Sequence, residues 1–201
     1  MKLLGSNTSP YVRKARLVLL EKSIPHEYVV DPPTEPGSLV LKLNPLGRIP
    51  TLILDDGFCV FDSSVIADYV DSLSESQILI PREDSRARLR VKRWEALADG
   101  IMDSAIVVRV ESLRPSEQQS PALLELHNTA ITKALNYASE LIGSPWCEGE
   151  AITLADLALV SALLYLDLRQ AERDWRGSHK NLANWFERIS ARRSVVVSRE
   201  G

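Results

Sequence analysis

Cysteine is scarce in this 201-residue sequence, which contains only Cys59 and Cys147. The two residues lie far apart in the chain and lack the Cys-x-x-Cys spacing of redox and metal motifs. Neither a disulfide framework nor a metal site is therefore expected. Cys59 falls in an expected strand, and we interpret it as part of the core.

A long hydrophobic run is also missing. The longest one, residues 157–166, is too short to cross a bilayer and is flanked by Asp156 and Asp167. We interpret it as a buried helix and expect no membrane association. The N-terminal residues lack the apolar stretch and the small-residue cleavage site of a signal peptide, so we expect a cytoplasmic protein.

The sequence has no excess of basic residues. Its formal net charge is -3, whereas binding to a polyanion needs clustered lysine and arginine that outweigh the acids around them. Nucleic acid is therefore not an expected partner. Apolar residues make up 45% of the chain and charged residues 25%, which is close to the average of folded globular proteins. A chain of this length can form one large domain or two small ones.

The first part of the chain alternates between strand and helix signals. The pair Ser9-Pro10 marks a helix start, because serine is a preferred N-cap and proline suits the first helical position. An Asp-Gly pair at positions 56 and 57 predicts a tight hairpin. Strands are expected at 2–6, 26–30, 51–54 and 58–61, and helices after Ser9, at 39–43 as a short turn, and after Asp62. This β-α-β-α-β-β-α order is that of a thioredoxin-like domain, to which we assign residues 1–76.

The rest of the chain has no strand pattern. We interpret residues 77–83 as a linker, because the sequence around them is rich in serine, proline and charge. Helical patterns follow at about 84–111, 121–142, 153–168 and 182–192. Residues 84–201 are therefore expected to form an all-helical second domain.

Ser9 is the first candidate functional residue. A hydroxyl at the start of a helix that follows a central strand lies where the helix dipole and free backbone N–H groups favour an anion. A thiolate placed there would be stabilised. Serine caps are common, however, so a purely structural N-cap is the simpler explanation of Ser9 taken alone.

The Ile49-Pro50 bond is the second candidate. Proline cannot donate to a sheet ladder, so it is confined to the start of a strand or to an edge. A cis bond at this point would turn the backbone N–H and C=O of Ile49 outward, where they could pair with an extended peptide ligand. A trans proline that begins a strand is the more common alternative.

The third candidate is the pair Asp62 and Ser63. A capping acid with hydroxyls at a helix N-terminus supplies N–H donors and a hydroxyl for a carboxylate, while the acid can accept from an ammonium group. This combination suits the head of an amino acid. Taken alone, it is also an ordinary helix cap.

Together, the order and spacing of these segments resemble those of the cytosolic glutathione transferases, in a bacterial, serine-type or omega/theta-like member. The resemblance rests on residues 8–13 (Thr-Ser-Pro-Tyr-Val-Arg), 44–52 (Asn-Pro-Leu-Gly-Arg-Ile-Pro-Thr-Leu) and 62–66 (Asp-Ser-Ser-Val-Ile). Residues 152–157 resemble the capping box and hydrophobic staple of the family's second domain, which are structural. With the closing residues 184–195, the resemblance covers nearly the whole chain.

The resemblance implies a role for each candidate. Ile49 would bind the cysteinyl backbone of glutathione through its main chain, beside a cis Pro50. Asp62 and Ser63 would hold the γ-glutamyl end. Arg48 occupies a place where the family often has a lysine near the glycyl carboxylate, although a solvated surface charge explains it equally well.

Two positions compete for the activation of sulfur. In glutaredoxin-like and omega-like members a cysteine stands immediately before the proline, which here is Ser9. In theta-like and delta-like members the serine sits one residue earlier, which here is Thr8. We favour Ser9 and keep Thr8 as the alternative, since either hydroxyl could donate to the thiolate. Because neither position is a cysteine, a mixed-disulfide or dehydroascorbate-type reductase is disfavoured.

The function implied by the resemblance is glutathione conjugation. Glutathione would be a co-substrate, with no permanently bound cofactor and no metal, and its thiolate would attack a largely apolar electrophile in detoxification. The family also implies a homodimer. Two alternatives stay open: a non-catalytic interaction or regulatory module with the same fold, and a glutathione-dependent isomerase or peroxidase.

Overall fold

The computed structural model describes residues 1–199. These residues form two compact units. The first consists of Met1–Glu83 together with the C-terminal segment that begins at Ala191, and the second is Asp84–Ser190. We describe each unit by itself.

The first unit has a mixed α/β architecture. Its elements are β1 (Lys2–Gly5), α1 (Pro10–Glu21), β2 (Glu27–Val30), α2 (Leu39–Leu43), β3 (Thr51–Ile53), β4 (Cys59–Val60), α3 (Ser63–Ser72) and α9 (Arg193–Arg199). From β1 to α3 this order confirms the predicted β-α-β-α-β-β-α arrangement and the thioredoxin-like fold class.

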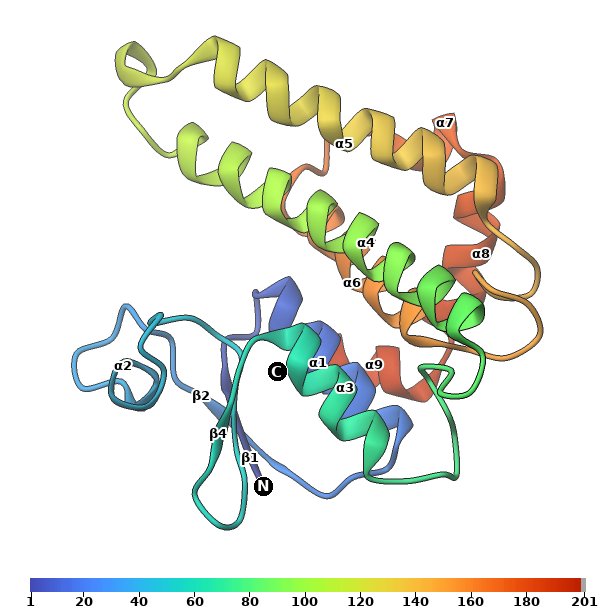
Figure 1. Ribbon diagram of the computed structural model, residues 1–201. Helices are drawn as coiled ribbons and strands as arrows, with labels where there is room; N and C mark the ends of the chain where they lie inside the picture. The colour runs from blue at the N-terminus through green and yellow to red at the C-terminus, as the bar shows by residue number, and fades with distance from the viewer. Residues whose placement is uncertain (200–201) are drawn as a thin grey trace. The chain divides into compact units, whose positions relative to one another are not determined.

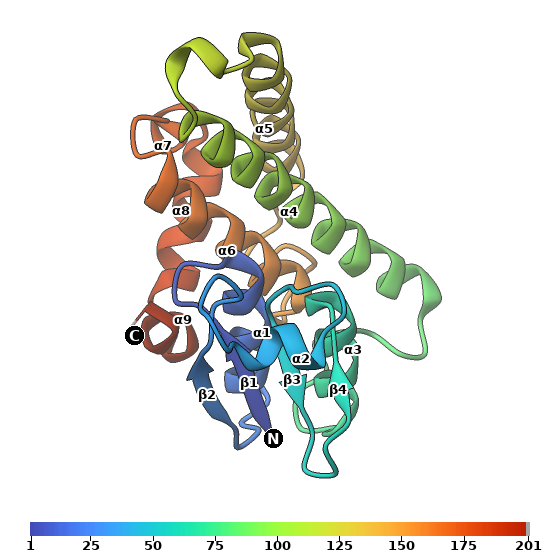
Figure 2. The ribbon, with the colours of Figure 1, turned by 90° about the vertical axis from the view of Figure 1, so that its left-hand side faces the viewer.

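The four strands form one sheet in the order β2-β1-β3-β4. Strand β1 pairs with β2 in parallel and with β3 antiparallel, and β3 pairs antiparallel with β4. Helices α1 and α3 pack together on one face of the sheet, and α2 lies on the other (Figures 1 and 2). The apolar side chains of β1 and α1, such as Leu3, Leu4 and Leu17, are fully buried in this layer.

Strand β1 and helix α1 approach each other closely at Gly5. A Cβ atom at this position would lie 2.5 Å from the Cγ1 atom of Val12. Only glycine therefore allows this approach. Gly5 ends the strand, and the turn of residues 6–9 leads directly into α1, so the close packing sets where the helix begins.

Helix α9 corrects the predicted extent of the helical domain. Residues 84–201 were expected to form that domain, but the segment from Ala191 belongs to the first unit, where α9 packs on α1. The physical reason is an ion pair. Arg192 donates two hydrogen bonds to the carboxylate of Glu21 at the end of α1, at 2.9 and 2.7 Å.

The segment after α3 is also anchored to the first unit. Lys22 and Asp71 form an ion pair of 3.1 Å whose side chains are almost completely buried. Asp71 also accepts hydrogen bonds from the backbone N–H groups of Leu79 and Ile80. The residues interpreted as a linker are therefore held in place up to Ile80.

The second unit is all-helical, as predicted. It contains α4 (Ser85–Ser112), a short 3-10 helix η1 (Ser116–Gln118), α5 (Pro121–Leu141), α6 (Leu154–Arg169), α7 (Trp175–Ser178) and α8 (Lys180–Ser190). The short α7 was not predicted. The helix expected at 182–192 begins two residues earlier and ends at Ser190, and the chain then starts the separate helix α9.

Helix α6 forms the core of the second unit. It packs against α4 and α8, and α4 also packs along α5 (Figure 1). All residues from Leu154 to Leu163 are buried, which confirms the interpretation of the longest apolar run as a buried helix. Within residues 1–199, no helix is long and apolar enough to cross a membrane.

Candidate functional site

The topology of the first unit brings the three candidate segments to one edge of the sheet. Leu4 near the end of β1 pairs with Thr51 at the start of β3, so the turn before Ser9 lies beside the Ile49-Pro50 bond. Strand β4 runs antiparallel to β3 and therefore ends at the same edge, where the chain enters α3 at Asp62. The three segments thus follow one another across the neighbouring strands β1, β3 and β4.

Ser9 is the N-cap of α1. Its hydroxyl oxygen accepts a hydrogen bond from the backbone N–H of Val12 at 3.4 Å. Its own N–H donates to the carbonyl of Ser6 at 3.2 Å and closes the turn. The hydroxyl proton remains available to donate, and the helix dipole favours an anion at this point. Thr8 lies one residue before the cap, and its side chain is exposed.

The loop before β3 is fixed by Asn44, a buried residue at the end of α2. Its side-chain amide donates to the carbonyl of Arg48 at 2.8 Å and to the hydroxyl of Thr51 at 3.2 Å. The Thr51 hydroxyl donates in turn to the same Arg48 carbonyl at 3.1 Å. The Ile49-Pro50 peptide bond in this loop is cis. Pro50 is buried, Ile49 is half-buried and Arg48 is exposed.

Asp62 is the N-cap of α3 and Ser63 is its first residue. One carboxylate oxygen of Asp62 accepts from the backbone N–H of Ser64 at 3.0 Å. The Asp62 side chain is exposed, whereas Ser63 is only 3% exposed. The Phe61-Asp62 peptide bond is cis. The first N–H groups of a helix have no partner inside it, so this end of α3 combines free donors with a carboxylate that has accepting capacity left.

Comparison with known proteins shows the family of the chain. A model of the glutathione S-transferase N-terminal domain matches residues 8–73, and one of the C-terminal domain matches residues 121–188. The chain is 36% identical over 196 residues to the Escherichia coli K12 protein named uncharacterized GST-like protein YibF, covering 98% of this chain and 96% of the other. The chain belongs to the glutathione S-transferase family.

Solved glutathione S-transferases have the same fold. A crystal structure from Methylobacillus flagellatus KT with glutathione bound superposes with a TM-score of 0.95 at 39% identity and covers 98% of each chain. Another, from Methylobacterium radiotolerans JCM 2831 in complex with glutathione sulfonate, gives a TM-score of 0.93 at 34% identity, with 98% of this chain and 93% of that one covered.

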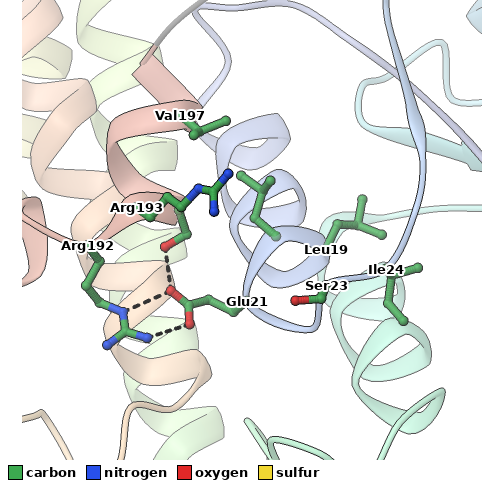
Figure 3. Close-up of a pocket in the computed structure, with 9 residues that line it drawn as sticks. Leu19, Glu21, Ser23, Ile24, Arg192, Arg193 and Val197 are labelled. Carbon is green, nitrogen blue, oxygen red and sulfur yellow. Dashed lines mark hydrogen bonds and ion pairs between the residues drawn. The ribbon is translucent and has the colours of Figure 1, made fainter.

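The first unit also has a cavity of about 710 Å³ that lies away from the candidate site. It is lined by the end of α1 and by α9, with Leu19, Ile24 and Val197 among its apolar residues (Figure 3). Helix α1 rises about 18 Å from Ser9 to Glu21 at ~1.5 Å per residue. Glu21, the carboxylate in the wall, is already bonded by Arg192 and Ser194, and none of the candidate residues Ser9, Ile49 and Asp62 lines this cavity.

Several residues that support the candidate site were not singled out by the sequence. Asn44 precedes a proline, and an Asn-Pro pair signals a turn, so its role in shaping the loop could have been found. Tyr28 and Arg13 both bond to Asn7, two residues before Ser9. No local pattern predicts those contacts, because Tyr28 comes from the neighbouring strand β2.

Proposed function

We propose that the protein binds glutathione at the edge formed by Ser9, Ile49 and Asp62, and activates its thiol for attack on an electrophile. The observation that carries the proposal is the placement of the three segments across β1, β3 and β4. Adjacent strands are ~4.8 Å apart, so the two outer segments lie about 10 Å from each other. An extended tripeptide spans about 10 Å at ~3.3 Å per residue.

Each segment has chemistry that fits one part of glutathione. The main chain of Ile49, in a loop fixed by Asn44, would pair with the cysteinyl backbone as an added strand does. Asp62 would accept from the γ-glutamyl ammonium, and the start of α3 at Ser63 would donate to its carboxylate. Arg48, exposed and without an ion-pair partner among residues 1–199, would attract the glycyl carboxylate.

The chemical step begins with the thiol. Its proton leaves to solvent, and the thiolate is stabilised by the hydroxyl proton of Ser9 and by the positive end of the α1 dipole. The sulfur then forms a bond to an electrophilic carbon of a largely apolar compound, while the bonding electron pair of the leaving group departs with that group. The two bound forms in the related crystal structures, glutathione and glutathione sulfonate, support a site for this peptide.

The test compares Ser9 with Thr8. In Ser9→Ala, we expect the kcat/KM for conjugation of an aryl halide to fall about 100-fold, since one donor to a developing anion contributes that much. The affinity for glutathione, measured by calorimetry, should stay within a few fold. Ser9→Gly controls for the cap, because glycine also lacks the hydroxyl but is tolerated at an N-cap, where alanine is not. Thr8→Val is the matched variant at the neighbouring position.

Each alternative predicts a different result. A loss in Thr8→Val with unchanged turnover in Ser9→Ala would assign activation to Thr8. Glutathione binding without turnover of any electrophile, hydroperoxide or isomerisable substrate would contradict catalysis and favour an interaction module. Turnover confined to a hydroperoxide or an isomerisable substrate would indicate the peroxidase or isomerase.

We also propose that the protein is a homodimer. The support is the family, in which dimers are the expected form. Light scattering coupled to gel filtration measures the mass directly, and a mass of about 22.4 kDa, that of a single chain, would contradict the proposal.

A further inference from the structure

A cluster of polar side chains holds the turn that carries Ser9. Tyr28 on strand β2 donates a hydrogen bond from its hydroxyl to the side-chain oxygen of Asn7, at 2.8 Å. Asn7 lies in the turn between β1 and α1. The only backbone bond within that turn, from the Ser9 N–H to Ser6, is a long one of 3.2 Å. The hydrogen bond from Tyr28 is therefore a second and shorter bond that holds the turn.

The side chain of Arg13 bonds to the main chain of the same residue, Asn7. One guanidinium nitrogen, Nη2, donates to the carbonyl oxygen of Asn7 at 3.3 Å, and the other, Nη1, donates to the carbonyl of Ser198 in α9 at 2.7 Å. Asn7 is thus bonded at its side chain from β2 and at its main chain from α1. Within residues 1–199, no carboxylate pairs with Arg13, and its hydrogen bonds go to the carbonyl oxygens of Asn7 and Ser198 and to the hydroxyl of Ser198.

Tyr28 is itself held in place. The guanidinium of Arg16 stacks over its ring at 4.2 Å from the centroid, and Arg16 also reaches the carbonyl of Ser198 at 3.4 Å. Burial raises the pKa of Tyr28, although the charges of Arg16 and Arg13 act in the opposite direction. The phenol therefore stays protonated at neutral pH and keeps the proton that it donates to Asn7.

We propose that Tyr28 and Arg13 are positioning residues for thiol activation, because they fix Asn7 and through it the orientation of Ser9. The inference rests on the proposed function of Ser9. A hydroxyl that must donate to a sulfur needs placement within a fraction of an ångström, and a misplacement of ~1 Å lowers rates by up to about 100-fold. A two-residue connection from Asn7 to the cap transmits such a displacement directly.

The test begins with Tyr28→Phe, which removes the donor and keeps the ring that stacks on Arg16. We expect kcat to fall about 10-fold and the KM for glutathione to stay within about twofold of the wild type. This is the pattern expected when the Ser9 hydroxyl is misplaced but glutathione binding is retained. The apparent thiol pKa in the pH profile of kcat/KM should rise by about half a unit or more. A purely structural tyrosine would lower the melting temperature and leave kcat and the pH profile unchanged.

The partner residue makes the test specific. In Asn7→Leu the same hydrogen bond is lost from its other end. If the bond is what matters, the double variant with Tyr28→Phe is no slower than the slower single variant, because both remove one interaction. Additive losses would overturn the proposal. Tyr137→Phe is the matched control, since Tyr137 lies on α5 with 40% of its surface exposed, and its turnover should equal that of the wild type.

A readout without turnover separates this inference from the proposed function. Hydrogen exchange at the Ser9 amide, measured by NMR in the free protein, should be several-fold faster in Tyr28→Phe and unchanged in Tyr137→Phe. Unchanged exchange with an unchanged pH profile would overturn the positioning role while leaving Ser9 catalysis intact. A wild type that binds glutathione but never conjugates it would overturn the proposed function, and the exchange at Ser9 would still decide whether Tyr28 fixes the turn.

Discussion

Two acids at helix starts of this protein, Asp156 in the capping box of α6 and Asp62 at the N-cap of α3, differ in how many hydrogen bonds they already accept. At the start of α6, Asp156 accepts from the backbone N–H groups of Cys147 and Thr153, the Thr153 hydroxyl and the indole N–H of Trp185, at 2.8 to 3.2 Å. Its side chain is fully buried. At the start of α3, Asp62 accepts from Ser64 and is exposed.

The comparison shows why the same local sequence pattern serves two purposes. Both acids follow the rule that a polar side chain caps the free N–H groups of a helix. Asp156 has no accepting capacity left, so it connects three segments of the second unit and acts in stability. In Asp62, the N–H of Ser64 occupies one of about four lone-pair positions of the carboxylate. The others can accept from a ligand.

The largest effect is expected from Asp156→Ala. The substitution leaves the buried donors of Cys147 and Trp185 without an acceptor, and each such group destabilises by about 1–3 kcal/mol. We expect the free energy of unfolding of the second unit to fall by about 3–5 kcal/mol. Urea denaturation followed by tryptophan fluorescence measures the change. Asp62→Ala removes a cap alone and should lower the free energy of unfolding of the first unit by only about 1 kcal/mol. Because all four tryptophans lie in the second unit, circular dichroism follows this change. Equal losses in the two variants would contradict the contrast between the two acids.

The next effect concerns ligand binding. Asp62→Asn retains a good N-cap but removes the charge that would accept from the ammonium of glutathione. We expect the affinity for glutathione to fall about 10-fold to 100-fold, as for a hydrogen bond to a charged group of about 1.5–3 kcal/mol. Calorimetry with a glutathione analogue that lacks the α-amino group should show no such loss.

The matched control for that variant is another exposed capping acid. Asp84 caps α4 and accepts from the backbone N–H groups of Arg86 and Ala87. Asp84→Asn should leave glutathione affinity unchanged. A similar loss in both variants would mean that Asp62 has no special place in the site.

The smallest effect is a pH dependence of opposite sign at two buried acids. Burial raises the pKa of Asp156, although N–H donors from Cys147 and Thr153 lower it. Burial also acts to raise the pKa of Glu21, but the bonds from Arg192 and Ser194 outweigh it, and that pKa is lowered. The folded state therefore holds the Asp156 proton more tightly, and the Glu21 proton less tightly, than the unfolded state.

The sign of each contribution follows by linkage. Stability from Asp156 falls as pH rises from the unfolded pKa of about 3.9 to the higher folded value. Stability from Glu21 is present above about pH 4.3 and is lost as pH falls through the lower folded value. Hydrogen exchange of the α6 and α9 amides, measured over a range of pH and corrected for intrinsic exchange, reports the two contributions. Asp156→Asn should remove the pH dependence of stability that comes from Asp156, and Glu21→Gln should remove the one that comes from Glu21. An unchanged pH dependence in either variant would contradict the assignment.

Local signals predicted the parts of the fold that local chemistry determines. Ser9-Pro10, Asp62 and Thr153 each marked a helix start within a residue of its observed place. The Asp-Gly pair placed the hairpin between β3 and β4, although β4 is only two residues long. Candidate site residues were found because helix caps and an X-Pro bond have sequence signatures.

Contacts between distant segments could not be predicted in this way. The hydrophobic periodicity of residues 193–199 does not indicate which unit this helix packs on. That packing depends on the ion pair of Arg192 with Glu21, which joins residues 171 positions apart. The bond between Tyr28 and Asn7 depends on the register of β1 with β2. Such information exists only once the sheet has formed.

The docking of α9 affects when the candidate site can be completed during synthesis. Residues 1–83 leave the ribosome first, and domains generally fold in that order. The carbonyl of Ser198 that receives Arg13 and Arg16 is made only after the whole helical unit. A nascent chain therefore carries its Ser9 turn without these supports until residue 198 has been made, and a fragment cut at the linker never acquires them.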